Sequence, residues 1–328
     1  MWSSTTWSDG CSRTQRRGGL IVYPENGKIW YNGKLVDWKD GRIHLASHVI
    51  HYGTGVFEGI RAYKTEKGPQ VFRLREHIRR FFLSAHAYQM PLPYSEEEII
   101  EACLETIRAN GFEECYIRPI AFRGYGPLGV FPGKCPVEVA ILTWKWGAYL
   151  GEEALTRGVR VTITGWRKFH GSMMPTTAKA CGQYLNSVLG VQEARQNGYD
   201  EAIFLDLTGN LSEGSGENIF LVFGDKIYTN GSESSILLGI TRDAVIQMAR
   251  GLGYHVETRL LARGDLYAAD EAFFTGTAAE ITPIREVDGR IIGKGEAGPV
   301  TRKLQSLFFE IVRGQRPEYQ HWLTPVYS

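Results

Sequence analysis

The stretches that carry most information in this 328-residue chain are PTTAKACGQYLN, residues 175–186, and LSEGSGENIF, residues 211–220. Lys179 stands in the first and Glu213 in the second, and small residues crowd both. A small residue beside a charged one lets a flat ligand approach the backbone. A lysine that can form a Schiff base and a carboxylate that keeps a ring nitrogen protonated are the groups that pyridoxal phosphate needs. We therefore expect a pyridoxal phosphate site.

The composition is that of an ordinary globular protein, with 43% hydrophobic and 22% charged residues. The formal net charge of +1 gives no electrostatic reason to expect nucleic acid or an anionic membrane as a partner. No apolar run approaches the roughly 20 residues that span a bilayer. The length allows two domains with a sizeable core.

The five cysteines are odd in number, irregularly spaced and without a C-x-x-C pair. This pattern favours a reducing compartment, which we expect to be the cytoplasm, over a disulfide framework or a metal site. Residues 1–20 are rich in Ser and Arg and lack the apolar segment of a signal peptide. We interpret them as a disordered tail or the product of a misplaced start codon, with an organellar transit peptide as the alternative.

Strands and helices are expected along the whole chain without strict alternation, which favours an α+β fold over a doubly wound sheet. Asn32-Gly33 predicts a hairpin, and Ser95 with Glu98 predicts a capping box that opens a helix. Expected helices cover 76–88, 95–111, 179–197, 298–314 and a segment from 241; expected strands cover 115–122, 137–143, 159–163, 202–206, 218–223, 226–229 and 271–274. A break in periodicity suggests domains at 21–145 and 158–328, joined by a loop at 146–157.

Each candidate residue also has an ordinary interpretation. Lys179 alone is most simply a solvated lysine on the first turn of a helix, with Tyr184 half-buried one turn later. Glu213 is most simply a surface acid in a glycine-rich turn, and Arg80 faces water as most helix arginines do. Thr241 reads as a helix N-cap, where free amides favour an anion, and 274–280 is a second turn rich in hydroxyls.

Gly124, Gly126 and Gly129 satisfy the G-x-G-x-x-G pattern of dinucleotide-binding folds. Pro127 lies inside the pattern, and Pro132-Gly133 follows where a helix should run. A glycine-rich active-site loop is therefore the better interpretation of this segment.

Residues 27–314 resemble the branched-chain amino-acid aminotransferases of the class IV, fold-type IV pyridoxal phosphate group. The resemblance rests on runs in the family's order: HYGTGVFEGIR (51–61), REH (75–77), YIRP (116–119), WGAY (146–149), AKA (178–180), SEG (212–214), GITR (239–242) and GTAAE (276–280). It implies a small N-terminal α/β sandwich domain, a larger C-terminal pseudo-barrel domain, and a homodimer or higher homo-oligomer.

The resemblance also implies a role for each candidate residue. Lys179 would be the Schiff-base lysine and proton shuttle, Tyr184 would bond the cofactor's phenolic oxygen, and Glu213 its ring nitrogen. The phosphate would be held by Arg80, Ile240, Thr241 and Thr277. The substrate would be bound by Thr277, Ala278, Tyr116, Arg118 and Gly216, and enclosed by Tyr52, Phe57, Leu128, Val130, Trp146 and Tyr149, with Leu128 and Val130 reaching a neighbouring subunit.

The activity that the resemblance implies is reversible, ping-pong transfer of an amino group between L-leucine, L-isoleucine or L-valine and 2-oxoglutarate. Arg118 would pair the second carboxylate of glutamate. A D-amino-acid or (R)-amine transaminase, or an aminodeoxychorismate lyase, is the alternative on the same fold, and a silent cofactor-binding protein is a third. Leu238 and Cys181 depart from the family's usual Pro and Gly, and Cys181 suggests sensitivity to oxidation.

Overall fold

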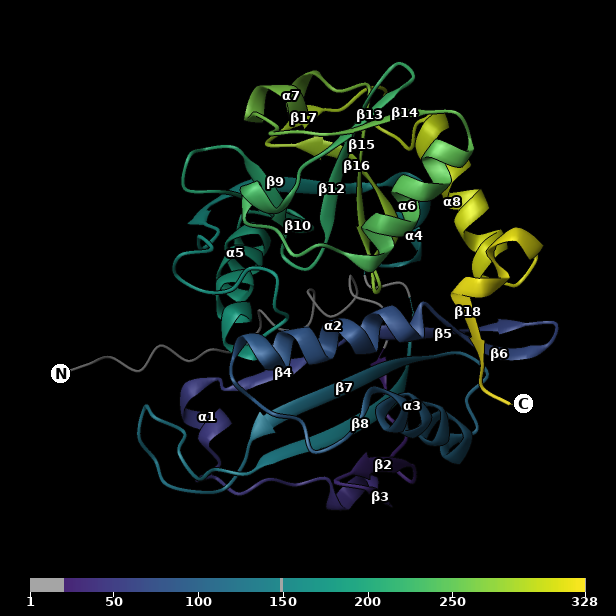
Figure 1. Cartoon of the computed structure of the whole chain (residues 1–328). Helices are drawn as coiled ribbons and strands as arrows, with labels where there is room; N and C mark the ends of the chain where they lie inside the picture. Colours follow the sequence, from purple (N-terminus) through teal and green to yellow (C-terminus); the bar gives the residue numbers. More distant parts are fainter. Residues whose placement is uncertain (1–20, 148–149, 328) are drawn as a thin grey trace, which may run out of the picture.

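The computed structural model describes residues 21–147 and 150–327, which fold around an antiparallel sheet and a mixed sheet, with helices between and outside them (Figure 1). The expected α+β class is confirmed, because helices and strands are interleaved and both sheets are largely antiparallel. The tail expected at 1–20 lies outside the described residues. No helix in the described ranges is long and apolar enough to cross a membrane.

The first sheet has the strand order β18-β6-β5-β7-β8-β2-β3, with β1 added to β8 and β4 added to β7. Asn32 and Gly33 have positive φ and turn the β2–β3 hairpin, as their sequence predicts. The strands are β1 (Ile21–Val22), β2 (Lys28–Tyr31), β3 (Lys34–Asp37), β4 (Gly55–Phe57), β5 (Ile60–Thr65), β6 (Gly68–Phe72), β7 (Cys115–Arg123), β8 (Val137–Trp146) and β18 (Leu323–Pro325).

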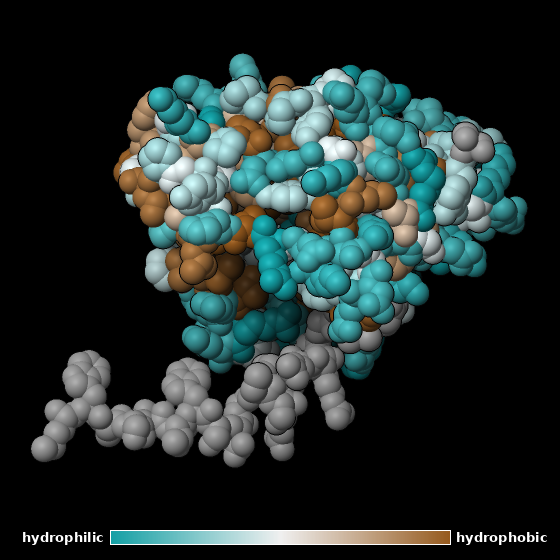
Figure 2. Space-filling model, turned by 90° about the horizontal axis from the view of Figure 1, so that it is seen from below, coloured by the Kyte–Doolittle hydropathy of each residue, from teal (hydrophilic) through white to brown (hydrophobic). Residues whose placement is uncertain are grey.

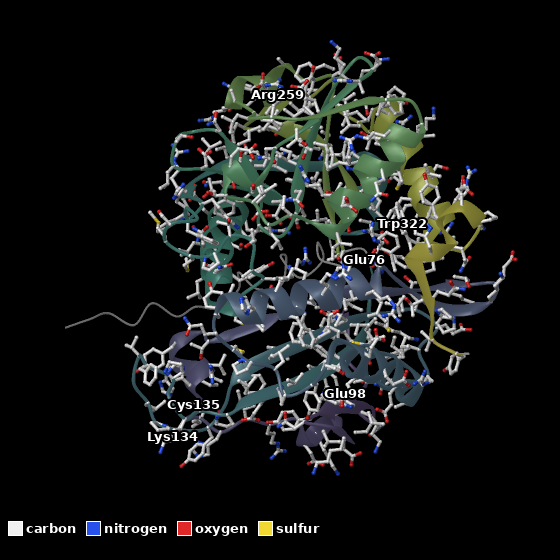
Figure 3. The ribbon with its side chains drawn as sticks, in the orientation of Figure 1. Glu76, Glu98, Lys134, Cys135, Arg259 and Trp322 are labelled. Carbon is white, nitrogen blue, oxygen red and sulfur yellow. The ribbon has the colours of Figure 1, made fainter. Side chains whose placement is uncertain are left out.

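Three helices accompany this sheet: α1 (His48–Tyr52), α2 (Leu74–Ala87) and α3 (Glu96–Asn110). The capping box forms as expected, since Ser95 Oγ accepts from the Glu98 amide and the Glu98 carboxylate accepts from the Ser95 amide. Glu98 thereby marks the start of α3 (Figure 3). Helix α2 crosses the molecule between the two sheets (Figure 1).

The second sheet has the order β11-β10-β9-β16-β15-β12-β13-β14, with β17 added to β16. Some of its interior residues form a separate apolar cluster around Val161, Leu221 and Phe274. The strands are β9 (Val159–Arg167), β10 (Glu201–Leu205), β11 (Leu211–Gly214), β12 (Asn218–Phe223), β13 (Lys226–Thr229), β14 (His255–Thr258), β15 (Glu271–Gly276), β16 (Glu280–Val287) and β17 (Arg290–Ile291).

Helix α5 (Tyr184–Gln196) packs on β9 and β10, whereas α6 (Ile240–Gly251) and α8 (Pro299–Val312) pack together beside β15. The short helices α4 (Glu152–Arg157) and α7 (Arg263–Ala268) complete the helices described, with 3-10 turns at 38–40, 181–183, 232–234 and 317–322.

The two sheets share a core. Tyr63 and Phe72 of the first sheet belong to the same buried apolar cluster as α6 and α8. Arg73 lies at the start of α2, forms ion pairs with Glu76 and Asp243, and places its guanidinium 4.9 Å from the Trp322 ring. Glu76 and Trp322 both lie where the halves of the molecule meet (Figure 3). The C-terminal strand β18 then returns to pair with β6. The domain bounds stay a prediction.

Two sequence expectations are wrong at their boundaries. The helix expected from Lys179 begins at Tyr184, because Ala180 is extended and bridges to Val56. Lys179 is therefore not on a helical turn.

The helix expected to use Thr241 as its N-cap begins before that residue, at Ile240, with Gly239 as the cap. The 124–129 segment leads from β7 into antiparallel β8 with no helix between, which agrees with rejecting a dinucleotide fold.

Gly190 offers a test of the packing between α5 and β10. Glycine inside a helix normally destabilises it by about 1 kcal/mol relative to alanine. A Cβ at Gly190 would lie 2.2 Å from Phe204 Cζ, and Phe204 is fully buried. We expect Gly190→Ala to lower the free energy of unfolding by about 1–3 kcal/mol because the core is overfilled. Denaturant unfolding at fixed protein concentration measures this.

Gly264 in α7 is the matched control, since an added Cβ there meets nothing within 4 Å. Gly264→Ala should leave stability unchanged or raise it. A Gly190→Ala protein as stable as the Gly264→Ala protein would contradict the packing argument.

Candidate active site

Lys179 lies in a pocket between the two sheets, and its amine is 2.6 Å from the Tyr184 hydroxyl. Burial lowers the pKa of the amine, and the positive charge of Arg80 adds to this effect. Burial also raises the pKa of Tyr184, which keeps its hydroxyl protonated. The segment before the helix is held by the Lys179 amide, which donates to Ser84 Oγ on α2 at 3.0 Å. Lysine and tyrosine therefore face the same pocket although no helical turn joins them.

Glu213 is not on a surface turn but on buried strand β11, where its side chain lines the same pocket. Its Oε1 is 2.7 Å from the amine of Lys168, and both side chains are 8% exposed. Oε2 accepts from the Leu237 amide at 3.0 Å and from Asn218 Nδ2 at 3.3 Å. A buried carboxylate needs such donors to remain charged away from water. Lys168 was missed by the sequence analysis.

Glu217 is a second carboxyl at the pocket wall, and it is buried as well. Burial raises its pKa well above the ordinary value, and the nearby charge of Glu201 raises it further. Glu213, beside a lysine, and Glu217, beside another acid, therefore present different chemistry to one pocket.

The N-terminus of α6 opens into the pocket. Gly239 caps this helix without a side-chain hydrogen bond, and the pocket is lined by Gly239, Ile240 and Thr241. Asn218 fixes the position of the turn, because its Oδ1 accepts from the Gly239 amide at 3.1 Å while its Nδ2 donates to Leu237 O at 2.8 Å. The free amides and the helix dipole favour an anion here.

Arg80 on α2 also lines the pocket, and it does not simply face water. Its Nε and Nη2 donate to the two carboxylate oxygens of Glu58 at 2.6 and 2.9 Å. Glu58 is fully buried and accepts from His77 Nδ1 at 2.7 Å as well. Burial opposes the charge of Glu58, but Arg80 and His77 together hold the pKa of this carboxyl well below its ordinary value. Nη1 of Arg80 donates to Leu238 O at 3.0 Å.

Phe57 connects this pocket to the first sheet. Its ring lies 4.9 Å from the Tyr184 ring, 5.1 Å from the Lys179 amine and 4.7 Å from the Arg118 guanidinium. Nη2 of Arg118 donates to the Tyr116 hydroxyl at 3.4 Å, whereas its Nε is buried without a hydrogen-bond partner. Glycine at position 59 leaves room for that hydroxyl, since a Cβ there would lie 1.9 Å from it and would displace the Tyr116 ring.

The structure thus brings one group of predicted site residues around a single pocket: Lys179, Tyr184, Glu213, Arg80, Ile240, Thr241, Gly216 and Thr277. Phe57, Tyr116 and Arg118 adjoin it, and Ala278 lies in the same turn as Thr277. Tyr52 lines a neighbouring pocket, and the Trp146 ring packs 4.7 Å from the Tyr116 ring. Leu128 and Val130 are exposed and do not line the pocket of Lys179. Tyr149 lies outside the described residues.

Cys181 lies beside the turn that precedes β4, and its sulfur would be 3.0 Å from a Cβ at Gly55. Burial raises the pKa of this thiol to about 11. Because the thiolate is the reactive form, this shift disfavours reaction of Cys181 at neutral pH, and the expected oxidation sensitivity stays a prediction. Leu238 is 45% exposed, and its carbonyl accepts from Arg80.

The groups around the pocket suit pyridoxal phosphate. An amine suits its aldehyde, a carboxylate held by a lysine suits its ring nitrogen, and an arginine at a helix N-terminus suits its phosphate. Thr275 Oγ1 also lines the pocket and is buried with no hydrogen-bond partner. The described residues contain no cluster of three or more His, Cys, Asp or Glu side chains that could hold a metal ion.

The Glu58–Arg80 pair leads to a prediction. Replacing one partner of a buried ion pair leaves the other charge uncompensated, at a cost of about 3–5 kcal/mol. We expect Glu58→Gln to lower the free energy of unfolding by this order in the cofactor-free protein. The loss should be smaller with pyridoxal phosphate bound, because its phosphate supplies negative charge beside Arg80. Thermal or denaturant unfolding of both forms measures this.

Glu97→Gln is the control, since the Arg75–Glu97 pair is exposed on both sides and should contribute little. An equal loss with and without cofactor would contradict a phosphate position beside Arg80.

Known proteins agree with this architecture. Residues 55–287 match the model of the family described as amino-transferase class IV. The branched-chain-amino-acid aminotransferase of Pseudomonas aeruginosa is 47% identical over 94% of this chain and 100% of its own length.

Two solved structures are also similar. The crystal structure of the Escherichia coli branched-chain amino acid aminotransferase superposes with a TM-score of 0.90 at 47% identity, covering 92% of this chain and 99% of the other. A branched-chain amino acid aminotransferase from T.th., complexed with N-(5'-phosphopyridoxyl)-L-glutamate, has a TM-score of 0.88 at 47% identity over the same shares. With a family match over most of its length and relatives of this similarity, the chain belongs to the class IV aminotransferases.

Proposed function

We propose that this chain is a pyridoxal phosphate-dependent aminotransferase that moves the amino group between L-leucine, L-isoleucine or L-valine and 2-oxoglutarate. The proposal rests above all on the partly buried Lys179 amine 2.6 Å from the Tyr184 hydroxyl, in a pocket that Glu213 and Arg80 also line. The names of the P. aeruginosa and E. coli relatives support the substrate class. The T.th. complex, which contains a phosphopyridoxyl group joined to glutamate, supports the cofactor and the acceptor.

Lys179 is suited to act as both nucleophile and proton carrier. An amine must be unprotonated to attack a carbonyl, and its lowered pKa makes that form more accessible near neutral pH. The hydrogen bond with Tyr184 holds the amine in place. When bound, pyridoxal phosphate supplies an electron sink that stabilises negative charge at the substrate's Cα. Lys179 would be the group that accepts the proton released from Cα and carries it within the site.

The hydrogen-bonding groups that line the pocket suggest the remaining contacts with the cofactor. Glu213, held by Lys168, would accept from the ring nitrogen and keep it protonated. Arg80, the Ile240 and Thr241 amides and the Thr277 hydroxyl would hold the phosphate. Tyr184 would bond the phenolic oxygen.

The substrate would lie between the cofactor and the first sheet. The Thr277 and Ala278 amides with the Tyr116 hydroxyl would bind the α-carboxylate. Phe57, Tyr52, Trp146 and Tyr149 would enclose the side chain, with Gly216 leaving room beside them, and Leu128 and Val130 would complete the pocket from a second subunit. The exposed positions of Leu128 and Val130 support that last assignment, at 51% and 84%.

Arg118 would let the same pocket accept glutamate. It is surrounded by the rings of Phe57, Tyr116 and Trp144, at 4.7, 5.3 and 5.5 Å, which also suit an aliphatic side chain. Its buried, unpartnered Nε offers a donor to a second carboxylate. One arginine surrounded by apolar rings would thus allow the same pocket to bind both a branched-chain amino acid and glutamate, whose side chains differ by one charge.

We also propose that the enzyme is a homodimer or a higher homo-oligomer. Several large apolar residues are exposed, and Figure 2 shows apolar patches on the face seen from below, which is typical of a surface that contacts another protein. The exposed apolar residues include Leu45, Ile50, Val130, Phe131, Leu185 and Val188. The free cysteines of the described residues support a reducing compartment, for which we propose the cytoplasm.

The half-reaction with leucine tests the function directly. Adding L-leucine to the purified protein loaded with pyridoxal phosphate, without a keto acid, should abolish the visible absorption of the lysine-bound cofactor. Adding 2-oxoglutarate should restore that absorption, because the acceptor takes up the amino group. A band that ignores L-leucine but responds to a D-amino acid or an (R)-amine would assign the alternative transaminases. A Lys179→Ala protein with wild-type turnover would refute the catalytic role.

Arg118→Ala tests the origin of dual specificity. We expect kcat/KM to fall by about tenfold or more for glutamate and 2-oxoglutarate, the size of a lost charged hydrogen bond, and much less for leucine. Steady-state kinetics in both directions give the two ratios. Equal losses for both substrates would sink the assigned role.

A further inference from the structure

Glu280 follows the turn whose amides would bind the substrate carboxylate. Two side chains from the other sheet contact Glu280. Strands β15 and β16 form a hairpin in which Gly276 is paired with Glu280, so 277–279 make the connecting turn. Glu280 is 4% exposed and has φ +54, a left-handed conformation that disfavours glutamate. Such a conformation persists only when the surrounding structure enforces it.

Two residues of β5, in the first sheet, reach across to this carboxylate. The Tyr63 hydroxyl donates to Glu280 Oε1 at 3.0 Å, and Arg61 Nη1 lies 3.5 Å from the same oxygen. Both side chains are buried, so the contacts are shielded from solvent. Burial also raises the pKa of Tyr63, which keeps its hydroxyl a donor at any physiological pH.

Arg61 also holds the opposite side of the proposed substrate pocket. Its Nη2 donates to the carbonyl of Trp146 at 3.2 Å and to Glu114 Oε1 at 3.0 Å. Trp146 ends β8 and packs against Tyr116, whose hydroxyl is a proposed carboxylate ligand. One guanidinium therefore touches both the residue that ends the 277–279 turn and the aromatic wall, which belong to different sheets.

We propose that Arg61, Tyr63 and Glu280 form a positioning clamp that sets the 277–279 turn at the correct distance from Tyr116, so that amides and hydroxyl converge on one substrate carboxylate. The inference rests on the proposed function of the site. None of the three clamp residues lines the pocket of Lys179, so they are positioning residues. They act through the turn, and their effect is specific to the α-carboxylate.

Binding of 4-methylvalerate tests the clamp, because this acid has the carbon skeleton of leucine but no amino group. It is titrated into the cofactor-loaded enzyme and followed by the change in the cofactor's visible spectrum. Glu280→Gly removes the carboxylate, and glycine readily adopts the left-handed backbone of this position. The dissociation constant of 4-methylvalerate should rise about tenfold in this variant, as for loss of a charged hydrogen bond. Glu280→Gln, which retains an acceptor for Tyr63, should lie between this variant and the wild type.

Glu286→Gln is the matched control. Glu286 is also on β16 and pairs with Arg160 at 2.9 Å, but both partners lie in the second sheet. The Glu286→Gln enzyme should bind 4-methylvalerate as tightly as the wild type. Cofactor affinity should fall less than carboxylate affinity in the Glu280 variants, because Arg80 and the α6 amides would hold the phosphate from outside the turn, and only Thr277 would contribute from within it.

The outcomes separate the inference from the proposed function. A wild-type enzyme that neither binds 4-methylvalerate nor reacts with L-leucine refutes the proposed function. A wild-type enzyme that does both, with Glu280 variants that bind as tightly as Glu286→Gln, overturns the clamp. Equal losses of carboxylate and cofactor affinity also overturn it, because the residues would then only support packing. If the Glu280 variants do not fold, Arg61→Lys decides, and an unchanged dissociation constant refutes the clamp.

Discussion

The need to pair every buried charge determines how this molecule is assembled around its pocket. Glu58 lies beside β4 with no exposure to solvent, and it is tolerable there because Arg80 and His77 on α2 donate to it. This pair fixes α2 against the first sheet and aims Arg80 at the α6 N-terminus, where it meets Leu238 O. The position of the anion-binding end of the pocket thus depends on the Glu58–Arg80 ion pair, although Glu58 does not line the pocket.

The same constraint acts at the other end of the pocket. Glu213 is buried on β11 and is held by Lys168 from the end of β9, and by Asn218, which also positions the cap of α6. A chain of hydrogen bonds therefore connects the carboxylate proposed to face the ring nitrogen with the turn proposed to face the phosphate. Because these donors are themselves held in place, the site is preorganised and little reorganisation is needed at the moment of reaction.

The pocket is a product of both sheets. The backbone of Lys179 is fixed by the Phe57 amide and the Ser84 hydroxyl, which belong to the first half of the chain. Tyr184 begins a helix that packs on the second sheet. The contacts of Glu280 with Tyr63 and the apolar cluster that includes Tyr63 also join residues of both sheets. Geometry across the interface between the sheets, more than any single element, determines where a substrate carboxylate would lie.

Local sequence was enough to predict the α+β class, the hairpin at Asn32-Gly33 and the capping box at Ser95, because secondary-structure propensity, turn chemistry and capping are local properties. The roles of the site residues came from the family resemblance and stay predictions. Local sequence also predicted a helix at Lys179 that the structure replaces with an extended segment, since pairing of Ala180 with Val56 overrides local propensity. No pattern indicated Lys168 beside Glu213, Glu58 beside Arg80, or Arg61 beside Glu280. Tertiary folding determines these pairs, because a buried charge is stabilised by whichever opposite charge lies next to it in space. Local sequence patterns do not predict which distant segments come together.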